Sequence, residues 1–231
     1  MKSITFYQTH EAAEIFVEAP KPASKMLPDW YRAQEGVLGF GGTIKKCMPI
    51  FDILTSGYFL TMPCDIYVDS TNPDKLVYFI PPDGLDKLKE DMFDTHLAQQ
   101  YSEYPKSEKY HKELLRIDPF YAVETKRGYS CMFIQPVHRG EPPLNLFPAV
   151  IDTDKYISHG HYSFQVEANF RGIVKQGTPI IQVIPFKRDD FISNVVSFEK
   201  GKEVLRRQAA KLKSTFSGGY KNKFRVIKKY K

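Results

Sequence analysis

The chain has 231 residues, of which 42% are hydrophobic and 26% charged, and its formal net charge is +6. This composition can bury a core in one large β domain or in a β domain with helical additions. No run approaches the roughly 18 apolar residues of a membrane-spanning helix. Residues 1–20 alternate apolar and polar side chains and include acids, unlike a signal peptide. We therefore expect a cytosolic-type protein that is neither secreted nor embedded in a membrane.

The net charge is distributed unevenly along the chain. Residues 202–231 hold 11 of the 33 Lys and Arg against one acid, a local charge of +10, so the other 201 residues carry −4. A basic tail on an acidic body fits contact with phosphates, with an acidic partner or with another subunit, and equally fits a solvated, solubilising tail. Aromatic residues interleave with these cations, as in some single-strand nucleic-acid binders. The candidate phosphate or partner contacts are Arg206, Arg207, Lys211, Lys221, Lys223, Arg225, Lys228 and Lys229.

The three cysteines, Cys47, Cys64 and Cys131, are an odd number at wide spacing without a C-x-x-C pair. This pattern favours neither a disulfide framework nor a thiolate zinc site. We expect all three to be buried, reduced side chains.

The N-terminal third predicts short strands and one helix. Residues 3–7 and 14–18 alternate like strands. Pro28 and Asp29 suit the first turn of a short helix, because a missing N–H costs little there and an acid meets the helix dipole. Trp30, the only tryptophan, is then either part of a clasp on the core or a stacking platform for a ligand.

The middle of the chain predicts strands around a helical insertion. The glycine-rich residues 36–49 match no phosphate-binding fingerprint and predict a turn. Residues 51–63 and 64–69 are typical of paired strands, and 75–82 of a further strand. Residues 84–116 are highly charged with leucines near helical spacing, which predicts one or two surface helices or a long insertion between strands.

Strand patterns resume at 120–125 and fill residues 128–188, where short apolar runs alternate with polar, Pro or Gly breaks. Residues 198–216 predict a basic helix that ends before Gly218 and Gly219. We expect a mainly β fold with a β-clip or sandwich-like core. The expected domains are residues 1–197, with the helical insertion, and a basic helix and tail at 198–231.

Three segments of the central stretch resemble the trimeric dUTPase and dCTP deaminase fold. They are GYSCMF (128–133), VIDTDKY (150–156) and QGTPIIQVI (176–184), which are similar to that family's G-Y strand, V-I-D-x-D-Y turn and closing strand. The whole chain, including PKPASKMLPDWY and KKCMPIFDILTSGY, also resembles an uncharacterised family of tailed bacteriophages and some bacteria. The first resemblance implies a dUTPase-like scaffold and trimeric assembly, and the second implies a phage setting.

The dUTPase resemblance makes Asp152 and Asp154 the candidate catalytic residues, since the family's first turn aspartate activates a water. Tyr156 arrives one residue late, because Lys155 intervenes, and such a shift reverses a side chain's face on a strand. HRGEPP replaces the family's R-S-G phosphate signature, and the glycine-rich C-terminal arm is missing. The candidate ligand contacts are Tyr156, His138, Arg139, Gln182 and Trp30.

A divalent metal site is an alternative. His159 and His161 are two residues apart, so on a strand they would face one side, and a carboxylate of Asp152 or Asp154, or His138, could complete a set. An H-x-H pair in a polar turn is otherwise an exposed pair of surface histidines.

The altered motifs favour a non-catalytic protein: a virion or assembly component, or a binder of a nucleotide-like ligand, in the cytoplasm of an infected bacterium or in the virion. The alternative is a nucleotide hydrolase or deaminase, or a metal-dependent enzyme, that uses Asp152. The expected partners are copies of the same chain or other virion proteins, with nucleic acid or an acidic partner at the tail. No bound cofactor is expected other than the alternative metal.

Overall fold

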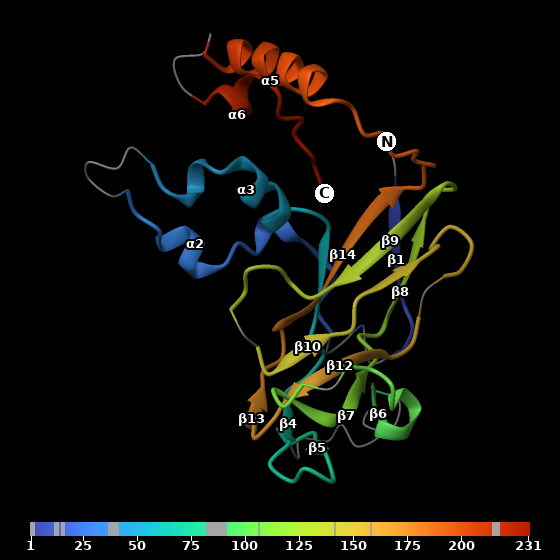
Figure 1. Cartoon of the computed structure of the whole chain (residues 1–231). Helices are drawn as coiled ribbons and strands as arrows, with labels where there is room; N and C mark the ends of the chain where they lie inside the picture. The colour runs from blue at the N-terminus through green and yellow to red at the C-terminus, as the bar shows by residue number, and fades with distance from the viewer. Residues whose placement is uncertain are drawn as a thin grey trace. The chain divides into compact units, whose positions relative to one another are not determined.

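The structure is a computed structural model that describes residues 3–11, 14, 17–36, 42–81, 92–105, 107–140, 142–157, 159–213 and 218–231 (Figure 1). It is mainly β, as the sequence predicted, and its strand pairs are antiparallel. The strands are β1 (Ile4–Gln8), β2 (Lys21–Pro22), β3 (Tyr58–Thr61), β4 (Ile66–Asp69), β5 (Val77–Phe79), β6 (Phe93–His96), β7 (Tyr110–Ile117), β8 (Tyr121–Thr125), β9 (Tyr129–Ile134), β10 (Leu144–Leu146), β11 (Ala149–Ile151), β12 (Tyr162–Glu167), β13 (Arg171–Val174) and β14 (Pro179–Lys187).

The helices are short except for one. They are the 3-10 turns η1 (Ala23–Lys25), η2 (Ile44–Lys46) and η3 (Ala98–Tyr101), and the α-helices α2 (Asp29–Ala33), α3 (Met48–Leu54), α5 (Phe198–Lys213) and α6 (Gly219–Lys223). Helix α2 begins directly after Pro28, and α5 is the predicted basic helix. None of the described helices is both long and apolar enough to cross a membrane.

The described strands form four sheets. The largest has the order β11-β9-β14-β3-β2, and a second has the order β10-β12-β7-β6. A three-stranded sheet, β13-β4-β5, and the pair β1-β8 complete them. Their inward faces form one apolar core in which Phe133, Phe164 and Leu115 are fully buried. Alternation within the strands produces this core, as in the burial pattern of β12, where every second residue is buried.

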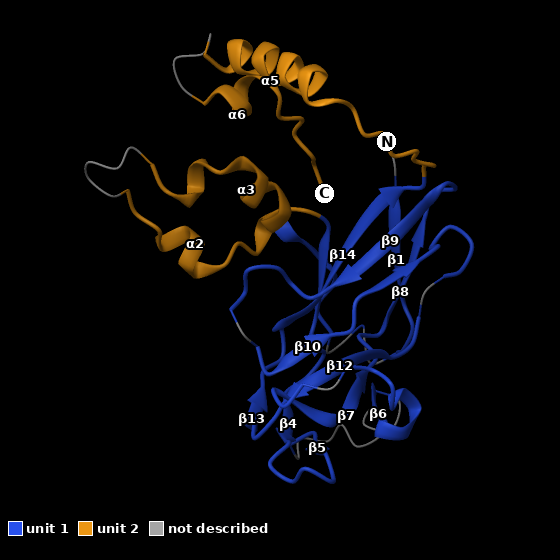
Figure 2. Cartoon of the chain, viewed as in Figure 1, with its two compact units in different colours: residues 1–23, 57–188 blue, residues 24–56, 189–231 orange. Residues whose placement is uncertain are grey.

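The chain divides into two compact units (Figure 2). Unit 1 comprises residues 1–23 and 57–188, and unit 2 comprises residues 24–56 and 189–231. Residues 24–56 thus group with the C-terminal segment rather than with the sheets. The expected division into a domain at 1–197 and a tail at 198–231 remains a prediction.

Gly57, which immediately precedes β3, leaves no room for a side chain. Its φ is +72°, and a Cβ atom there would lie 2.0 Å from the carbonyl oxygen of Val183 on β14. Any side chain would therefore push β3 away from its partner strand.

Three predicted elements differ from the structure. Of the strand expected at 14–18, residues 15 and 16 lie outside the described residues, and Glu14, Val17 and Glu18 are not in a strand. The strand expected at 51–63 begins only at Tyr58, because residues 48–54 form α3. Its expected pairing with 64–69 is also wrong, since β3 pairs with β14 and β2 while β4 pairs with β13 and β5.

The helical insertion expected at 84–116 is mostly wrong where the structure describes it, because the regular elements there are strands apart from the 3-10 turn η3. Residues 82–91 and 106 lie outside the described residues, but Phe93–His96 and Tyr110–Ile117 are the paired strands β6 and β7. The charges of this segment, such as Arg116 and Asp94, form an ion pair between the two strands. Sheet pairing outweighed a weak helical spacing of leucines.

The cysteines follow the prediction in two of three cases. Cys64 and Cys131 are buried free thiols, and burial raises the pKa of each to about 11. Cys47 is exposed, so its predicted burial is wrong. Cys47 directly precedes α3, within residues 36–49, for which the sequence predicts a turn.

Candidate functional site

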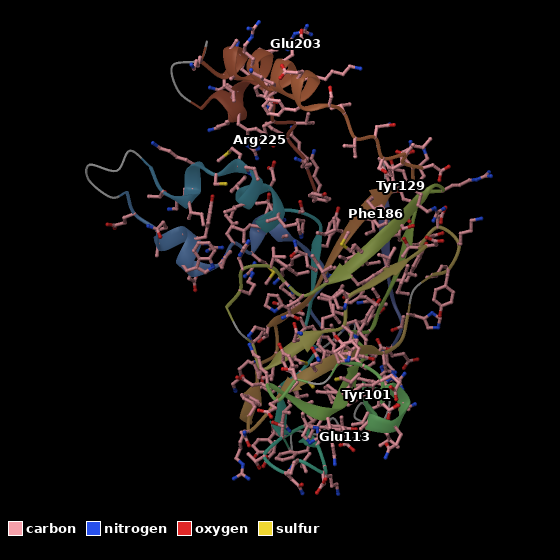
Figure 3. All side chains as sticks on the ribbon, viewed as in Figure 1. Tyr101, Glu113, Tyr129, Phe186, Glu203 and Arg225 are labelled. Atoms are coloured by element: carbon pink, nitrogen blue, oxygen red, sulfur yellow. The ribbon has the colours of Figure 1, made fainter. Side chains whose placement is uncertain are left out.

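The acidic turn, which we define as residues 152–156, lies beside two other strand ends because of the register of the largest sheet. Ile151 of β11 pairs with Cys131 of β9, so Asp152 falls beside Ser130. On the other side of β9, Lys187 of β14 pairs with Tyr129. Arg188 therefore lies opposite Gly128, and its backbone N–H donates to the Gly128 carbonyl at 2.9 Å. Figure 3 labels Tyr129 and Phe186 in this part of the sheet.

Asp154 forms an ion pair with Arg188. The guanidinium donates from Nη1 to Oδ1 at 2.6 Å and from Nη2 to Oδ2 at 2.5 Å, a bidentate arrangement. The backbone N–H of Gly128 adds a third bond to Oδ2, at 2.7 Å. Only 1% of the Asp154 side chain is exposed. The hydrogen bonds from Arg188, with that from Gly128, lower the pKa of Asp154 to about 2.

Gly128 makes this contact possible through its backbone conformation. Its φ is +84°, and no atom lies within 4 Å of where a Cβ would be. The constraint is therefore the left-handed backbone rather than lack of space. That conformation turns the N–H toward Asp154.

Asp152 occupies a more open position. Its Oδ1 accepts a 2.6 Å hydrogen bond from the Ser130 hydroxyl and lies 3.2 Å from Nη1 of Arg188, yet 59% of its side chain is exposed. The Ser130 hydrogen bond, followed by the charge of Arg188, lowers the pKa of Asp152. A carboxylate with a lowered pKa is ionised at neutral pH but is a weaker general base.

Thr153 anchors the turn from below. Its side chain is fully buried, and its hydroxyl lies 2.7 Å from that of Thr125 and 3.4 Å from Sγ of Cys131. The backbone N–H of Thr125 also donates to the Thr153 carbonyl. With Thr153 inward, Asp152 and Asp154 project to the side where Arg188 meets them. The arrangement binds three strand ends together by charge, and Arg188 contacts both acids.

The later part of the acidic turn opens on a surface pocket. Tyr156 is 55% exposed, and its ring stacks with His159 at 6.0 Å between centroids. Both side chains line a pocket of about 280 Å³, together with His161 and residues of β11 and β12. Tyr156 is thus exposed, while the two aspartates face Arg188.

The alternative metal set is not formed. Within the part of the chain that the structure describes, no three His, Cys, Asp or Glu side chains gather as metal ligands. Nδ1 of His159 lies 3.0 Å from the carbonyl oxygen of Ile157, and Asp154 forms an ion pair with Arg188. The structure places His159 and His161 on the pocket wall instead.

The other predicted ligand contacts in unit 1 are Gln182, Arg139 and His138, and each has its own surroundings. Gln182 is fully buried in β14, where its Oε1 accepts from the Val137 N–H at 3.1 Å and so holds the loop after β9. The Arg139 guanidinium lies 4.7 Å from the Phe59 ring centroid, and His138 is exposed with a φ of +55°. Arg139 therefore packs on the core.

The predicted contacts in unit 2 fall into two groups. Arg225 and Lys228 pair with Asp52 at 2.8 and 3.0 Å, and Arg207 pairs with Glu203 one helical turn away (Figure 3 labels Arg225 and Glu203). Trp30 is 40% exposed and contacts Tyr31 edge-on. The other predicted contacts, Arg206, Lys211, Lys221, Lys223 and Lys229, are exposed.

Sequence reasoning missed Arg188 and Asp52. Arg188 directly follows β14. Only the register of the sheet places it opposite Gly128, and no local sequence pattern reveals that register. Asp52 sat in a segment interpreted as a strand. In α3 it is nearly buried, with 11% of its side chain exposed.

Comparison with known proteins gives a distant structural likeness. No protein-family model matches the chain, and no curated protein matches it. Among solved structures, a mutant dUTPase from phage phi11 of S. aureus aligns with a TM-score of 0.38 and 8% identity, covering 85% of this chain and 99% of that one. A mutant dUTPase from Staphylococcus bacteriophage 80alpha aligns with a TM-score of 0.36 and 9% identity, covering 85% and 97%. Both TM-scores lie below 0.5, so nothing further is concluded from these alignments.

Proposed function

We propose that this protein is a non-catalytic, phage-type assembly component that is built into a larger complex through its C-terminal region. The observation that carries the proposal is the exposure of the C-terminal arm, residues 189–198. Its large apolar side chains face solvent: Phe191 (89% exposed), Ile192 (89%), Val195 (101%), Val196 (59%) and Phe198 (78%).

Such an arm is unfavourable in an isolated chain. Apolar area left in water forgoes about 25 cal/mol for each Å² that a contact would bury. Helix α5 continues the pattern, because it has no buried residue and exposes Val204 (60%) and Leu205 (65%). Contiguous exposed apolar surface of this kind is typical of a protein interface. The arm and helix therefore fit a segment that is covered in an assembly.

Charge favours copies of the same chain as the partner. Residues 202–231 carry +10 and the other residues −4, so the basic region of one copy complements the acidic remainder of another. If the C-terminal region reaches a neighbouring copy, the apolar arm is covered and the basic residues of 202–231 meet acidic groups. The protein would then act in the virion or in the cytoplasm of the infected bacterium.

The acidic turn supports the non-catalytic part of the proposal. Arg188 neutralises Asp154 completely and contacts Asp152, and both carboxyl pKa values lie below their ordinary range. A general base at neutral pH works best with a pKa near the working pH. The turn is better suited to holding strands together than to abstracting a proton.

The test is the mass of the full chain in solution, measured by light scattering over a range of protein concentrations. The double variant Ile192→Glu/Val195→Glu places charge at apolar arm positions, and the matched control Ser193→Glu/Asn194→Glu places the same charge at the adjacent polar positions. We expect the wild type and the control to form the same oligomer and the double variant to be monomeric. A wild type that stays monomeric at every concentration, or an arm variant with the wild-type mass, would overturn the proposal.

A second function is favoured by one observation: the Asp152 carboxylate is ionised and 59% exposed beside a surface pocket. That geometry also fits a nucleotide hydrolase that uses Asp152. The discriminating assay is phosphate or pyrophosphate release from each deoxynucleoside triphosphate with wild type and Asp152→Asn. Turnover that disappears in Asp152→Asn, with an unchanged circular dichroism spectrum, would replace the assembly proposal by an enzymatic one.

A further inference from the structure

A pocket of unit 1 lies away from the acidic turn, between η3, β7 and β12. It has a volume of about 430 Å³, within the range of about 300–1,000 Å³ that is typical of small-molecule sites. Three tyrosines line it, Tyr101, Tyr104 and Tyr110, and we call it the tyrosine pocket. Figure 3 labels Tyr101, close to Glu113 of β7, at this end of unit 1.

The pocket walls are held in place by hydrogen bonds. The Tyr101 hydroxyl donates to the Lys112 carbonyl, and burial, with the nearby charge of Glu113, raises the pKa of Tyr101 to about 12. Its phenol is therefore neutral and its ring fixed. The Tyr104 ring packs on Phe147 at 4.9 Å between centroids, so a second wall is supported from behind. Fixed aromatic rings present contact area without the cost of ordering them on binding.

The deeper polar atoms of the pocket are already paired. Nδ1 of His111 accepts from the Glu113 N–H at 3.0 Å, which leaves Nε2 to donate to the Asn72 carbonyl at 2.9 Å. Oε1 of Gln165 accepts from Asn145 at 2.9 Å, so the Nε2 amide is the end of Gln165 that can donate to a ligand. The polar groups offered to a ligand therefore lie toward the rim, where Ser107 and Glu108 are exposed.

The charges of the pocket disfavour a phosphorylated ligand. The charged side chains in its described lining are Glu108 and Lys112, and Lys112 pairs with Asp74. Phosphate sites instead present cations or backbone N–H groups to the anion. The ligand that fits is neutral, with an apolar face for the tyrosine rings and hydroxyl groups around its edge.

A saccharide ring has this distribution of groups. Its C–H face packs on aromatic rings, and its hydroxyls both donate and accept hydrogen bonds at the perimeter. A nucleobase presents its polar atoms along one edge and needs matching donors and acceptors in the pocket wall. In the tyrosine pocket the ring nitrogens of His111 and Oε1 of Gln165 are already bonded within the protein, which leaves the Gln165 amide as a donor and offers no matched set of donors and acceptors along one edge. We propose that the tyrosine pocket binds a neutral saccharide.

The experiment titrates the full chain, labelled with ¹³C-tyrosine, with the methyl glycosides of glucose, galactose, mannose and N-acetylglucosamine, and in parallel with uridine and adenosine. Tyr104→Ala removes one wall, and Tyr7→Ala is the matched control, because both side chains are 44% exposed and Tyr7 lies on β1, outside the pocket. Circular dichroism verifies that both variants are folded.

We expect at least one glycoside to shift the resonances of Tyr101, Tyr104 and Tyr110 in a saturable manner. Tyr104→Ala should weaken that binding about tenfold or more, and Tyr7→Ala should leave it unchanged. The proposal is overturned if no glycoside shifts these resonances, if both variants bind alike, or if only the nucleosides bind. None of these results depends on the oligomeric state, so the pocket and the assembly proposal stand or fall separately.

Discussion

Unit 1 and unit 2 are stabilised in different ways. Unit 1 has an apolar core in which large side chains such as Phe59, Phe133 and Phe164 are at most 1% exposed. In the described residues of unit 2, those that are buried are Pro28, Tyr31, Asp52, Leu54 and Ser56, and none lies in 189–231. The sheets therefore depend mainly on the hydrophobic effect, whereas polar contacts, such as that of Asp52 with Arg225, hold the C-terminal part of unit 2.

Each unit nevertheless contains one nearly buried aspartate paired with arginine. Asp154 of unit 1 meets an Arg188 that is 34 residues away, at the end of a neighbouring strand. Asp52 of unit 2 meets Arg225 and Lys228, 173 and 176 residues away, and so ties helix α3 to the C-terminal segment. In unit 1 the pair supplements a packed core, and in unit 2 it is a principal contact between two distant segments.

The largest effect is expected from a cavity in the core of unit 1. Phe164→Ala should lower the free energy of unfolding by about 3–5 kcal/mol, since it removes a fully buried ring. Urea unfolding followed by far-ultraviolet circular dichroism reports the strands. Val150→Ala, at a position that is 61% exposed on β11, is the control and should change the transition little. Equal loss in both variants would contradict the assignment of the core.

An intermediate effect is expected in unit 2 from Asp52→Asn. The change leaves the Arg225 side chain, which is 10% exposed, without its charged acceptor. Hydrogen bonds to charged groups are worth more than neutral ones, so amide exchange in α3 and in residues 218–231 should accelerate about tenfold or more. The exposed Asp29 on α2 provides the control variant Asp29→Asn. Exchange that is unchanged, or that rises equally in the control, would show that the pair does not hold the segment.

The smallest effect is a pH dependence of unit 1. Because Arg188 lowers the pKa of Asp154 to about 2 from an ordinary 3.8, the pair stabilises the fold fully above about pH 4, and this contribution is lost as the pH falls toward 2. Urea midpoints across that range should fall less steeply for Asp154→Asn than for the wild type, although the variant starts lower at neutral pH. Parallel curves would mean that Asp154 titrates normally in the folded protein.

Local sequence patterns predicted much of the fold. Strand patterns identified β8 at 120–125, apolar runs identified strands within 128–188, and the apolar spacing at 198–216 identified α5. The errors came from segments in which local preference was ambiguous. Residues 48–54 are apolar enough for a strand yet form a helix, and residues 110–117 carry charges on a strand because one face of that strand meets solvent.

The functional roles of the candidate site residues remain predictions, but their positions can be compared with the sequence patterns. Asp152 and Asp154 were identified from their turn, and Tyr156 was expected to be displaced, which agrees with its exposed position. Gln182 was expected to contact a ligand but is buried, because its position on a central strand faces the interior. The tyrosine pocket escaped prediction because the charged segment that forms it was interpreted as helical.

By itself the sequence determined the features that depend on neighbouring residues: a mainly β fold, an acidic turn, a basic helix and the charge difference between body and tail. The tertiary structure decided which distant groups meet. Asp154 became the partner of Arg188 because β9 pairs with both β11 and β14, and that register sets two strand ends side by side. Alternation and capping act over a few residues, whereas an ion pair across a sheet depends on the register of every strand between its partners.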